Sequence, residues 1–488
     1  MQAILSIDQG TTSTRSLLVN EAGEIVASHS QSLAQYFPQD GWVEHDGEEI
    51  LNAVIACARR VLEHAEAPGV IGIGLTNQRE TTLIWNRRTG KPLHRAIVWQ
   101  DRRTQLICDR LRADGRELPI QDKTGLVLDP YFSGAKLSWL LDNVEGARAL
   151  ACEGELAFGT VDSWLIYALT GGSCHVTDAT NASRTMLYDI RTGRWDPEIL
   201  AWLGIPESVL PEVLDSAADF GITTKPMLGA ELRILGVAGD QQAAMIGQAC
   251  LKPGMVKSTY GTGCFMLMNT GEEAPRSRHK LLGTIAYRLG GKATYALEGS
   301  IFVAGATLDW LRDVGVLNSI EEAGALAARA SPNSRAILVP GFTGLGAPYW
   351  NADARGAILG MTRDTGKAEI AGAALDAAAF QTRDLLEAMA ADTGVPVKQL
   401  RVDGGMAKSD EFVQRLANLT GVEVLRAATT ETTGLGAAYL AGLKAGLLKD
   451  LTAIEKLWRA EASFYPRITT VERDARYEAW KRALRRVL

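Results

Sequence analysis

The feature that most constrains this chain is the turn that follows its first strand. Residues 3–7 form an apolar run typical of a buried strand; Asp8, the turn Gly10-Thr11-Thr12 and Arg15 follow. Such a turn presents backbone N–H groups and hydroxyls to one point, which is an arrangement that binds anions. A carboxylate there repels a bare phosphate, but not a phosphate that carries Mg²⁺. The stretch therefore indicates a magnesium–phosphate site, with a hairpin and a capping Asp as the alternative.

The strand-end glycine turn occurs at two further places. Tyr260-Gly261-Thr262-Gly263 follows one strand-like segment, and Asp403-Gly404-Gly405 ends another. Three such turns are typical of a nucleotide-binding cleft, although each alone could be a tight loop. Hairpins mixed with strand–helix units favour an α/β fold with a mixed sheet. The expected elements are strands at 3–7, 16–19, 24–30, 70–75, 82–85, 96–99, 234–238, 336–339 and 400–403, a strand–turn–strand unit at 256–268, and helices at 47–65, 369–391 and 433–446.

Composition and missing motifs exclude several classes of protein. The 488 residues suffice for two or three domains, and the net charge of −6 provides no overall basic field for nucleic acid. Scattered cysteines, and histidines without metal-ligand spacing, predict reduced thiols and no zinc centre. We expect neither a signal peptide nor membrane insertion. The chain has no P-loop, no G-x-G-x-x-G and no protein-kinase signature, which disfavours a Rossmann dehydrogenase and a protein kinase.

A polar stretch, Thr-Asn-Gln-Arg-Glu-Thr-Thr at 76–82, lies just beyond an expected strand. Arg79 can donate hydrogen bonds to the hydroxyls of a polyol, and Glu80 can accept them. By itself the pair could equally be a solvated charged turn. The stretch becomes informative only beside the other segments of the chain.

Those segments are SIDQGTTSTR (6–15), GWVEHD (41–46), TNQRETT (76–82), AIVWQDRRT (96–104), TGLVLDPYFSGAKLSWLLDN (124–143), GTVDSWL (159–165), TNASRTML (180–187), GVAGDQQAA (236–244), YGTGCFMLMNTG (260–271), FTGLGAPYW (342–350) and RVDGG (401–405). Together they resemble the FGGY carbohydrate kinases and, within that family, the glycerol kinases. Residues 131–143 and 356–376 also fit the general FGGY signatures. The stretch at 76–82 is much more specific to the glycerol kinases.

The resemblance implies an α/β fold of two ribonuclease H-like domains, of the actin and hexokinase type, flanking a central cleft. Residues 1–246 would form the N-terminal domain with the polyol site and the phosphate turn, and residues 247–488 the nucleotide-binding C-terminal domain. The implied reaction is the ATP-dependent phosphorylation of glycerol to sn-glycerol 3-phosphate, the first step of glycerol catabolism. The implied ligands are glycerol, ATP or ADP and Mg²⁺, and we expect a cytoplasmic homodimer or homotetramer.

The resemblance also assigns roles to individual residues. Asp240 matches the general base, and Asp8 matches the acid that holds magnesium. The residues implied for glycerol hydroxyls are Arg79, Glu80, Tyr131, Asp240 and Gln241, with Trp99 and Phe265 as the apolar wall. The residues implied for ATP are Thr11, Thr12, Ser13, Arg15, Thr262, Gly305, Gly405 and Ser409.

Four features depart from the family pattern. Asp309 stands where many relatives have Gln, so it either perturbs nucleotide binding or faces solvent. Ser409 replaces a frequent Asn. Glu231 occupies a position where some bacterial relatives use Arg to bind a sugar bisphosphate inhibitor, so we expect weak bisphosphate inhibition. Residues 472–487 form a basic amphipathic helix that could serve a partner or a membrane surface, or be a solvated face.

Three other functions are compatible with parts of the pattern. An FGGY kinase for a pentulose or a tetritol would lack the fit of Arg79 and Glu80 to glycerol. A polyol sensor without catalysis would not need Asp8, Asp240 and both Gly-Thr turns. An actin-like filament protein would keep the ATP cleft without the polyol pocket. Phosphorylation assays with competing polyols distinguish these functions.

Overall fold

The first sheet is built around β1 (Gln2–Gln9), whose apolar residues are buried on both faces. The computed structural model describes residues 2–63 and 69–488. The five strands of this sheet run in the order β13-β5-β1-β2-β3, with β5 and β13 parallel to their neighbours and β2 and β3 antiparallel. Their bounds are β2 Ser13–Asn20, β3 Ile25–Ser32, β5 Gly69–Asn77 and β13 Ile234–Gly239. All five strands expected here are confirmed.

Helices cover both faces of this sheet. The helix α1 (Gly47–Leu62) packs against β1, β2 and β3, and the Asp46 side chain caps its first turn. It was expected to run to residue 65, but residues 64 and 65 lie outside the described residues. The helix α15 (Thr432–Ala445) packs against β1, β5 and β13. Because both faces are covered, the central strands can be almost entirely apolar.

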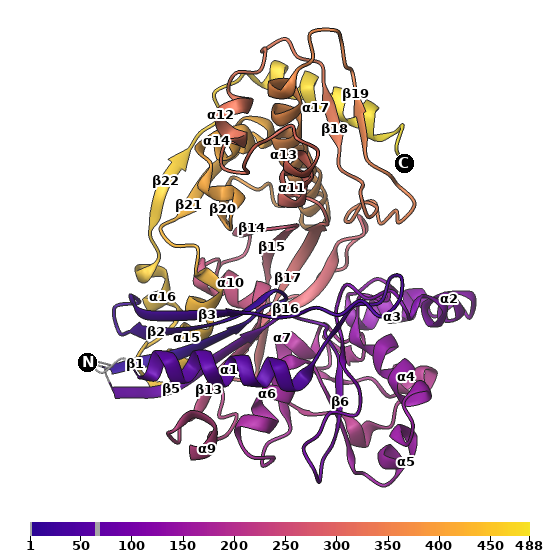
Figure 1. The fold of residues 1–488 in the computed structure, drawn as a ribbon, viewed down its shortest axis with the longest axis vertical. Helices are drawn as coiled ribbons and strands as arrows, with labels where there is room; N and C mark the ends of the chain where they lie inside the picture. Colours follow the sequence, from indigo (N-terminus) through magenta and orange to yellow (C-terminus); the bar gives the residue numbers. More distant parts are fainter. Residues whose placement is uncertain (1, 64–68) are drawn as a thin grey trace.

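The second sheet has seven strands in the order β16-β17-β15-β14-β20-β21-β22. Long helices, α13 (Lys367–Thr393) and α14 (Asp410–Thr420), pack beside it in the upper lobe (Figure 1). The strand bounds are β14 Val256–Tyr260, β15 Cys264–Gly271, β16 Leu282–Leu289, β17 Lys292–Ile301, β20 Gln399–Asp403, β21 Glu423–Ala427 and β22 Ala460–Phe464. The expected strand–turn–strand at 256–268 is β14 and β15.

The two lobes meet where α10 (Asp240–Gly247) packs against α15. A Cβ on Gly247 would lie 1.9 Å from the Thr432 carbonyl oxygen, and one on Gly436 would lie 1.8 Å from that of Ala243. Only glycine permits such a close helix pair. Since α15 comes from the second half of the sequence but covers the first sheet, the chain halves and the lobes do not coincide. The domain boundary at 246/247 stays a prediction.

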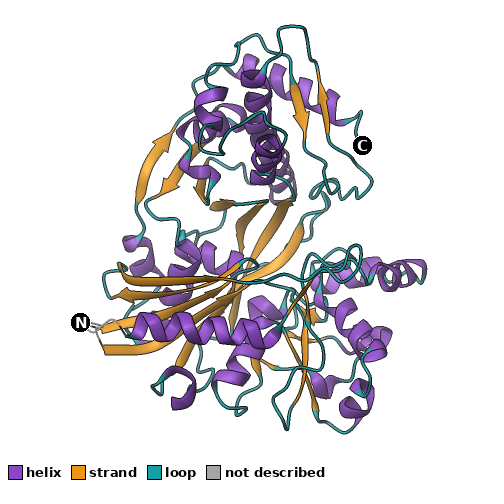
Figure 2. Ribbon diagram, in the orientation of Figure 1, coloured by secondary structure: helices purple, strands orange, loops and turns teal. Residues whose placement is uncertain are grey.

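Smaller elements extend the lower lobe around β6 (Leu83–Asn86) and β8 (Leu156–Gly159), with helices on its outer side (Figure 2). These helices are α2 Gln105–Ala113, α3 Glu117–Thr124, α4 Ser133–Asn143 and α5 Ala147–Cys152. The strand expected at 96–99 is shorter in the structure, where β7 contains only Ala96 and Ile97. The strand expected at 336–339 is β18 (Ile337–Val339), which pairs with β19 (Ala357–Leu359) and belongs to neither large sheet. In the described part of the chain, none of the helices combines the length and the apolarity needed to cross a bilayer.

The C-terminal helix α17 (Thr470–Leu484) packs with one face against the long helix α13. Tyr477 and Trp480 are buried, and both donate hydrogen bonds to Asp384 on α13. The ring of Trp480 stacks on Phe380 at a centroid distance of 5.4 Å. One face of α17 therefore belongs to the core of the upper lobe, and Arg476 also pairs with Asp376 on α13, at 2.7 Å.

Candidate active site

The candidate acids lie at the carboxyl ends of neighbouring parallel strands. Asp8 pairs in register with Thr76 on β5, and Gly239, just before Asp240, pairs with Asn77. The two acids are thus two strand spacings apart, about 10 Å between backbones. The pKa of Asp8 is raised to about 7 by burial and by the negative charges of Asp240 and Glu431. Both acids therefore lie at the same edge of the sheet, the edge at which open α/β sheets bind ligands.

Arg79 is the centre of a buried ionic network next to Asp240. Its Nε lies 3.0 Å from Asp240 Oδ1, and its terminal nitrogens donate to both carboxylate oxygens of Glu298, at 2.5 and 3.2 Å. A further bond of 3.2 Å runs from Arg79 to Gln242. The Arg79 side chain is 2% exposed and that of Asp240 29%. Asp240, the candidate general base, is thus accessible to a ligand, while its partner Arg79 is buried and held by several hydrogen bonds.

Arg184 and Glu298 complete this network and were not identified from the sequence. Arg184 donates to Glu80 at 2.6 Å and to Glu298 at 2.9 Å. Burial raises the pKa of Glu80 despite both arginines, whereas in Glu298 the arginines outweigh burial and lower the pKa. Glu298 is the one acidic residue of β17 and is fully buried there. That charge was the only local signal in the sequence that could have singled it out.

Aromatic side chains line the space beside the network. The ring of Trp99 contacts those of Tyr131 and Phe265 edge-on, at centroid distances of 5.7 and 6.1 Å. The guanidinium of Arg79 lies 5.8 Å from the centre of the Phe265 ring. The structure thus brings together six of the seven residues expected to bind glycerol. The seventh, Gln241, follows Asp240 on α10, is buried, and accepts a hydrogen bond from Lys257, which also donates to the Phe265 carbonyl. Charged groups on one side and rings on the other suit a small polyol.

The phosphate turn closes on itself and is tied to the aromatic wall. The Gly10 N–H donates to the Ser13 carbonyl at 2.9 Å, and Trp99 Nε1 donates to Thr11 Oγ1 at 2.9 Å. Arg15 forms an ion pair with Glu431, which precedes α15. This partner was not expected from the sequence. A pocket of about 430 Å³ adjoins the pair.

The nucleotide candidates form two groups on the second lobe. The N–H of Gly305 donates to the Gly261 carbonyl at 3.0 Å, which places the start of α11 (Gly305–Asp313) against the Thr262 turn. Gly405 is exposed, and Ser409 caps α14 by accepting from Phe412. A pocket of about 420 Å³ includes Asp403 and Gly404. Asp309 is 45% exposed and pairs with Arg312 at 3.1 Å.

The donor set fits a magnesium ion that arrives with a nucleotide. Mg²⁺ takes one or two carboxylates together with phosphate oxygens and water. Asp8 supplies one carboxylate beside the glycine turn. Among residues 2–63 and 69–488 no group of three or more His, Cys, Asp or Glu side chains could hold a metal. Asp8 would thus be the protein's carboxylate toward a magnesium ion bound with a nucleotide.

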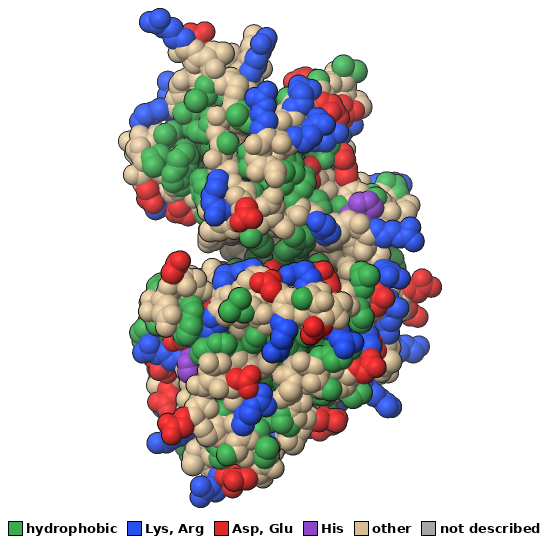
Figure 3. Space-filling model, turned by 90° about the vertical axis from the view of Figure 1, so that its right-hand side faces the viewer, with side chains coloured by type: hydrophobic (Ala, Val, Ile, Leu, Met, Phe, Trp, Pro, Cys, Tyr) green, Lys and Arg blue, Asp and Glu red, His purple; other side chains and the backbone are tan. Residues whose placement is uncertain are grey.

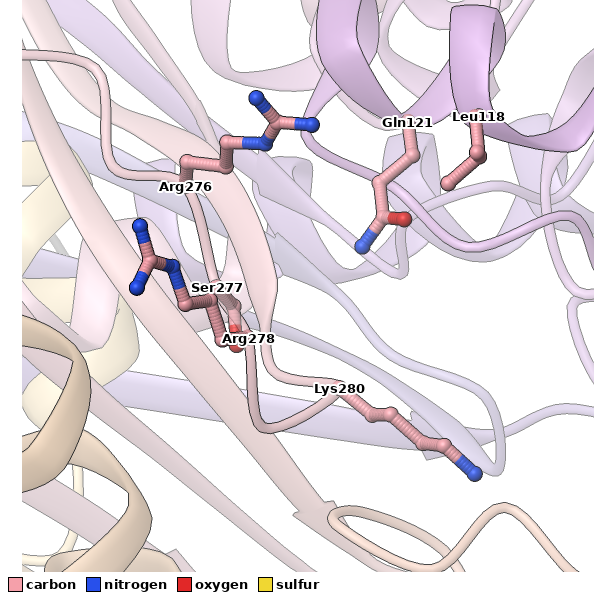
Figure 4. A pocket seen from close by; sticks show the side chains of 6 residues that line it. All are labelled: Leu118, Gln121, Arg276, Ser277, Arg278 and Lys280. Atoms are coloured by element: carbon pink, nitrogen blue, oxygen red, sulfur yellow. The ribbon is translucent and has the colours of Figure 1, made fainter.

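One pocket of about 460 Å³ is separate from these residues. Its basic side chains point in different directions (Figure 4), and Arg276 pairs with Asp122 at 3.0 Å. Its lining residues are Leu118, Gln121, Arg276, Ser277, Arg278 and Lys280. None of them belongs to the candidate site.

Between the two lobes the molecular surface is notched (Figure 3), as the expected central cleft requires.

Comparison with known proteins first defines the class. The N-terminal domain of the FGGY family of carbohydrate kinases matches residues 3–247, and the C-terminal domain of that family matches residues 256–445. The chain therefore belongs to the FGGY family of carbohydrate kinases.

The most similar curated relatives indicate the subgroup of the family to which the chain belongs. A glycerol kinase from Alcanivorax borkumensis is 56% identical over 490 residues, which cover 100% of this chain and 98% of the relative. With that identity over its full length, the chain is placed among the glycerol kinases. The crystal structure of Plasmodium falciparum glycerol kinase with ADP has a TM-score of 0.94 and 37% identity, and the match covers 100% of this chain and 98% of that one.

A ligand-bound xylulose kinase from Lactobacillus acidophilus shares the fold alone, with a TM-score of 0.88 at 23% identity over 99% of this chain and 96% of that one. These matches confirm the expected architecture of two ribonuclease H-like domains. They also show that the fold by itself does not choose the substrate, so the choice has to be argued from the site.

Proposed function

We propose that the chain transfers the γ-phosphoryl group of ATP to a terminal hydroxyl of glycerol, giving sn-glycerol 3-phosphate, and that Asp240 accepts the hydroxyl proton. The observation that carries this proposal is the position of Asp240, partly open and 3.0 Å from the buried Arg79, at the strand edge that also bears Asp8. The proposed polyol-binding and phosphate-side groups thus lie at one edge of the first sheet.

The proposed polyol pocket has polar groups for the hydroxyls of glycerol and aromatic rings for its carbon chain. The carboxylate of Glu80 accepts hydroxyl hydrogen bonds, while Arg79, Tyr131 and the Gln241 amide donate them. Trp99 and Phe265 cover the carbon chain. A site built to bond each hydroxyl discriminates against an analogue that lacks one, because buried polar groups then stay unpaired. These contacts therefore favour glycerol over a diol.

The chemical step needs few protein groups. As the new bond forms between the glycerol oxygen and the γ-phosphorus, the bond from that phosphorus to the ADP oxygen breaks, and the hydroxyl proton moves to Asp240. General-base assistance of this kind contributes about 10²–10⁴-fold. The remaining acceleration comes from positioning by the buried network and from the amides of the phosphate turn.

On the phosphate side, Asp8 would hold Mg²⁺, and Thr11, Thr12, Ser13 and Arg15 would contact phosphate oxygens. Bound with the nucleotide, Mg²⁺ screens phosphate charge during transfer. Thr262, Gly305, Gly405 and Ser409 would line the rest of the nucleotide. For Arg15 this role requires release from Glu431, because the two are paired in the structure.

The test is ATP-dependent phosphorylation of glycerol by the purified chain, with ribulose, xylulose and erythritol as competitors and alternative substrates. We expect glycerol to have the highest kcat/KM and the product to be the 3-phosphate isomer. Preference for a pentulose would reassign the substrate within the family. Glycerol binding without ATP turnover would instead indicate a sensor.

Two further expectations remain proposals. We expect a homodimer or a homotetramer, which light scattering coupled to size-exclusion chromatography measures directly. We also expect a cytoplasmic protein, because all six cysteines, which lie in the described part of the chain, are free thiols. Fractionation of cells of the source organism tests the location.

A further inference from the structure

Two buried lysines lie behind the polyol pocket, one on each side. Lys136 belongs to α4 in the lower lobe and Lys257 to β14 of the second sheet, and both are 0% exposed. Neither ammonium forms an ion pair with a carboxylate in the part of the chain that the structure describes. Their partners are carbonyl, amide and hydroxyl oxygens.

Lys136 joins two segments that carry proposed glycerol ligands. Its Nζ donates to the carbonyl oxygen of Tyr131 at 2.5 Å and to that of Glu80 at 3.3 Å. Glu80 has a left-handed backbone, with φ of 60°. Ser133 Oγ and Thr82 Oγ1 also donate to the Glu80 carbonyl, at 3.0 and 2.9 Å. The strained residue is thus fixed by three donors, and only Lys136 also reaches Tyr131.

Lys257 does the same on the opposite side. Its Nζ donates to the side-chain oxygen of Gln241, to Thr259 Oγ1 at 3.1 Å and to the carbonyl oxygen of Phe265 at 3.4 Å. A lysine ammonium can only donate, so the Gln241 oxygen must face Lys257. The Gln241 NH₂ group then points away from the lysine and is free to donate to a substrate hydroxyl.

Both lysines are costly choices for stability. Burial lowers the pKa of each, that of Lys136 to about 8. A buried ammonium loses its hydration, so it is held at the oxygens that accept its hydrogen bonds.

We propose that Lys136 and Lys257 are positioning residues that set the spacing of the hydroxyl-binding groups. Lys136 fixes Glu80 relative to Tyr131, and Lys257 fixes the Gln241 amide relative to Phe265. The inference rests on the proposed glycerol site. Neither lysine touches the reacting atoms, so each acts on substrate binding and selectivity.

The experiment compares Lys136→Met and Lys257→Met with the parent enzyme in steady-state kinetics. Methionine keeps the length of the side chain and removes the donors. We expect KM for glycerol to rise about tenfold in each variant, with kcat and KM for ATP changed less than about threefold, because among the described residues neither lysine forms a hydrogen bond with Asp240 or Asp8. The preference for glycerol over propane-1,2-diol should fall by about the same factor as the hydroxyl-binding groups loosen.

Controls separate positioning from loss of structure. Ser138→Ala removes a buried donor on α4 that bonds the Leu203 carbonyl, and Lys252→Met removes an exposed lysine paired with Glu455. Both should keep parent kinetics. Should a methionine variant not fold, Lys136→Gln and Lys257→Gln retain one donor group and should give an intermediate KM.

The outcomes distinguish the two levels of the argument. If the folded lysine variants keep the parent KM for glycerol and the parent preference over propane-1,2-diol, the positioning role is wrong and the proposed function is unaffected. The same holds if KM for ATP rises as much as KM for glycerol. A parent chain that does not phosphorylate glycerol contradicts the proposed function and this inference with it.

Discussion

The buried ionic network beside the proposed polyol site and the turns on the proposed nucleotide side are built in opposite ways. Arg79, Glu80 and Glu298 are at most 3% exposed and are joined by ion pairs across the two lobes. Thr12, Gly261 and Thr262 are exposed and are held by backbone turns. A buried ionic network cannot rearrange without leaving charges unpaired, whereas exposed glycine turns can. The comparison indicates that the proposed glycerol site forms before its ligand arrives and that the proposed nucleotide site is completed by its ligand.

The largest expected effect lies where the two regions meet. Asp240→Asn keeps the shape of the side chain but removes the proton acceptor. We expect kcat to fall by about 10²–10⁴-fold, with KM for glycerol changed by no more than a few-fold. Coupled-assay kinetics measure this, and Asp219→Asn, at an exposed acid paired with Arg233, is the matched control. A loss confined to KM would place Asp240 in binding instead.

Matched charge removals on the two sides test the contrast in rigidity. Glu298→Gln leaves Arg79 and Arg184 partly unpaired in the interior, so the free energy of unfolding should fall by about 3–5 kcal/mol. Glu431→Gln frees the half-exposed Arg15 and should cost about 0–1 kcal/mol. Urea denaturation of both variants against the parent gives the two values. Equal losses would show that both sides are equally rigid.

The protonation of Asp8 predicts how pH affects the nucleotide side. Its pKa of about 7 lies above the usual 3.8 because of burial, Asp240 and Glu431, with Arg15 opposing them. Affinity for Mg-nucleotide, which needs the carboxylate, should therefore decrease by about tenfold per pH unit below 7. The folded chain also keeps a proton that the unfolded chain has released, so without ligand its stability should decrease from pH ~4 to ~7.

Calorimetric titrations and urea denaturation across this pH range check both slopes. Asp8→Asn is the matched variant, because it keeps the side-chain shape and cannot titrate. It should bind Mg-nucleotide weakly at every pH. An unchanged slope in this variant would assign the titration to another group.

The smallest expected effect concerns the loop at 224–233. Glu231 is exposed there, and Arg233 is paired with Asp219 at 2.5 Å. An acidic residue beside a paired arginine offers little attraction for a bisphosphate, so millimolar fructose 1,6-bisphosphate should change activity by less than about twofold. Inhibition at sub-millimolar concentration would contradict this prediction. We expect the bisphosphate to change neither the affinity for glycerol nor that for Mg-nucleotide.

Local patterns carried most of the successful predictions. Apolar runs located β1, β5, β13 and β20, and Ala-rich stretches located α13 and α15, because neighbouring residues decide both signals. Weak, short elements were less accurate, as at β7, where pairing with β4 (Glu44–His45) limits the strand to two residues. The face that α17 buries depends on Asp384 and Phe380, far away in sequence.

By itself the sequence determined the strand-end acids, the glycine turns, the family and the residues expected to touch glycerol, because each is encoded in a short contiguous stretch. Only the tertiary structure decided what holds those residues in place. Glu298 meets Arg79 across 219 positions and Arg184 meets Glu80 across 104. Lys136 and Lys257 acquire their partners in the same way. Ion pairs and hydrogen bonds act through space at distances of a few ångströms, so a pattern along the chain cannot specify them until the lobes have assembled.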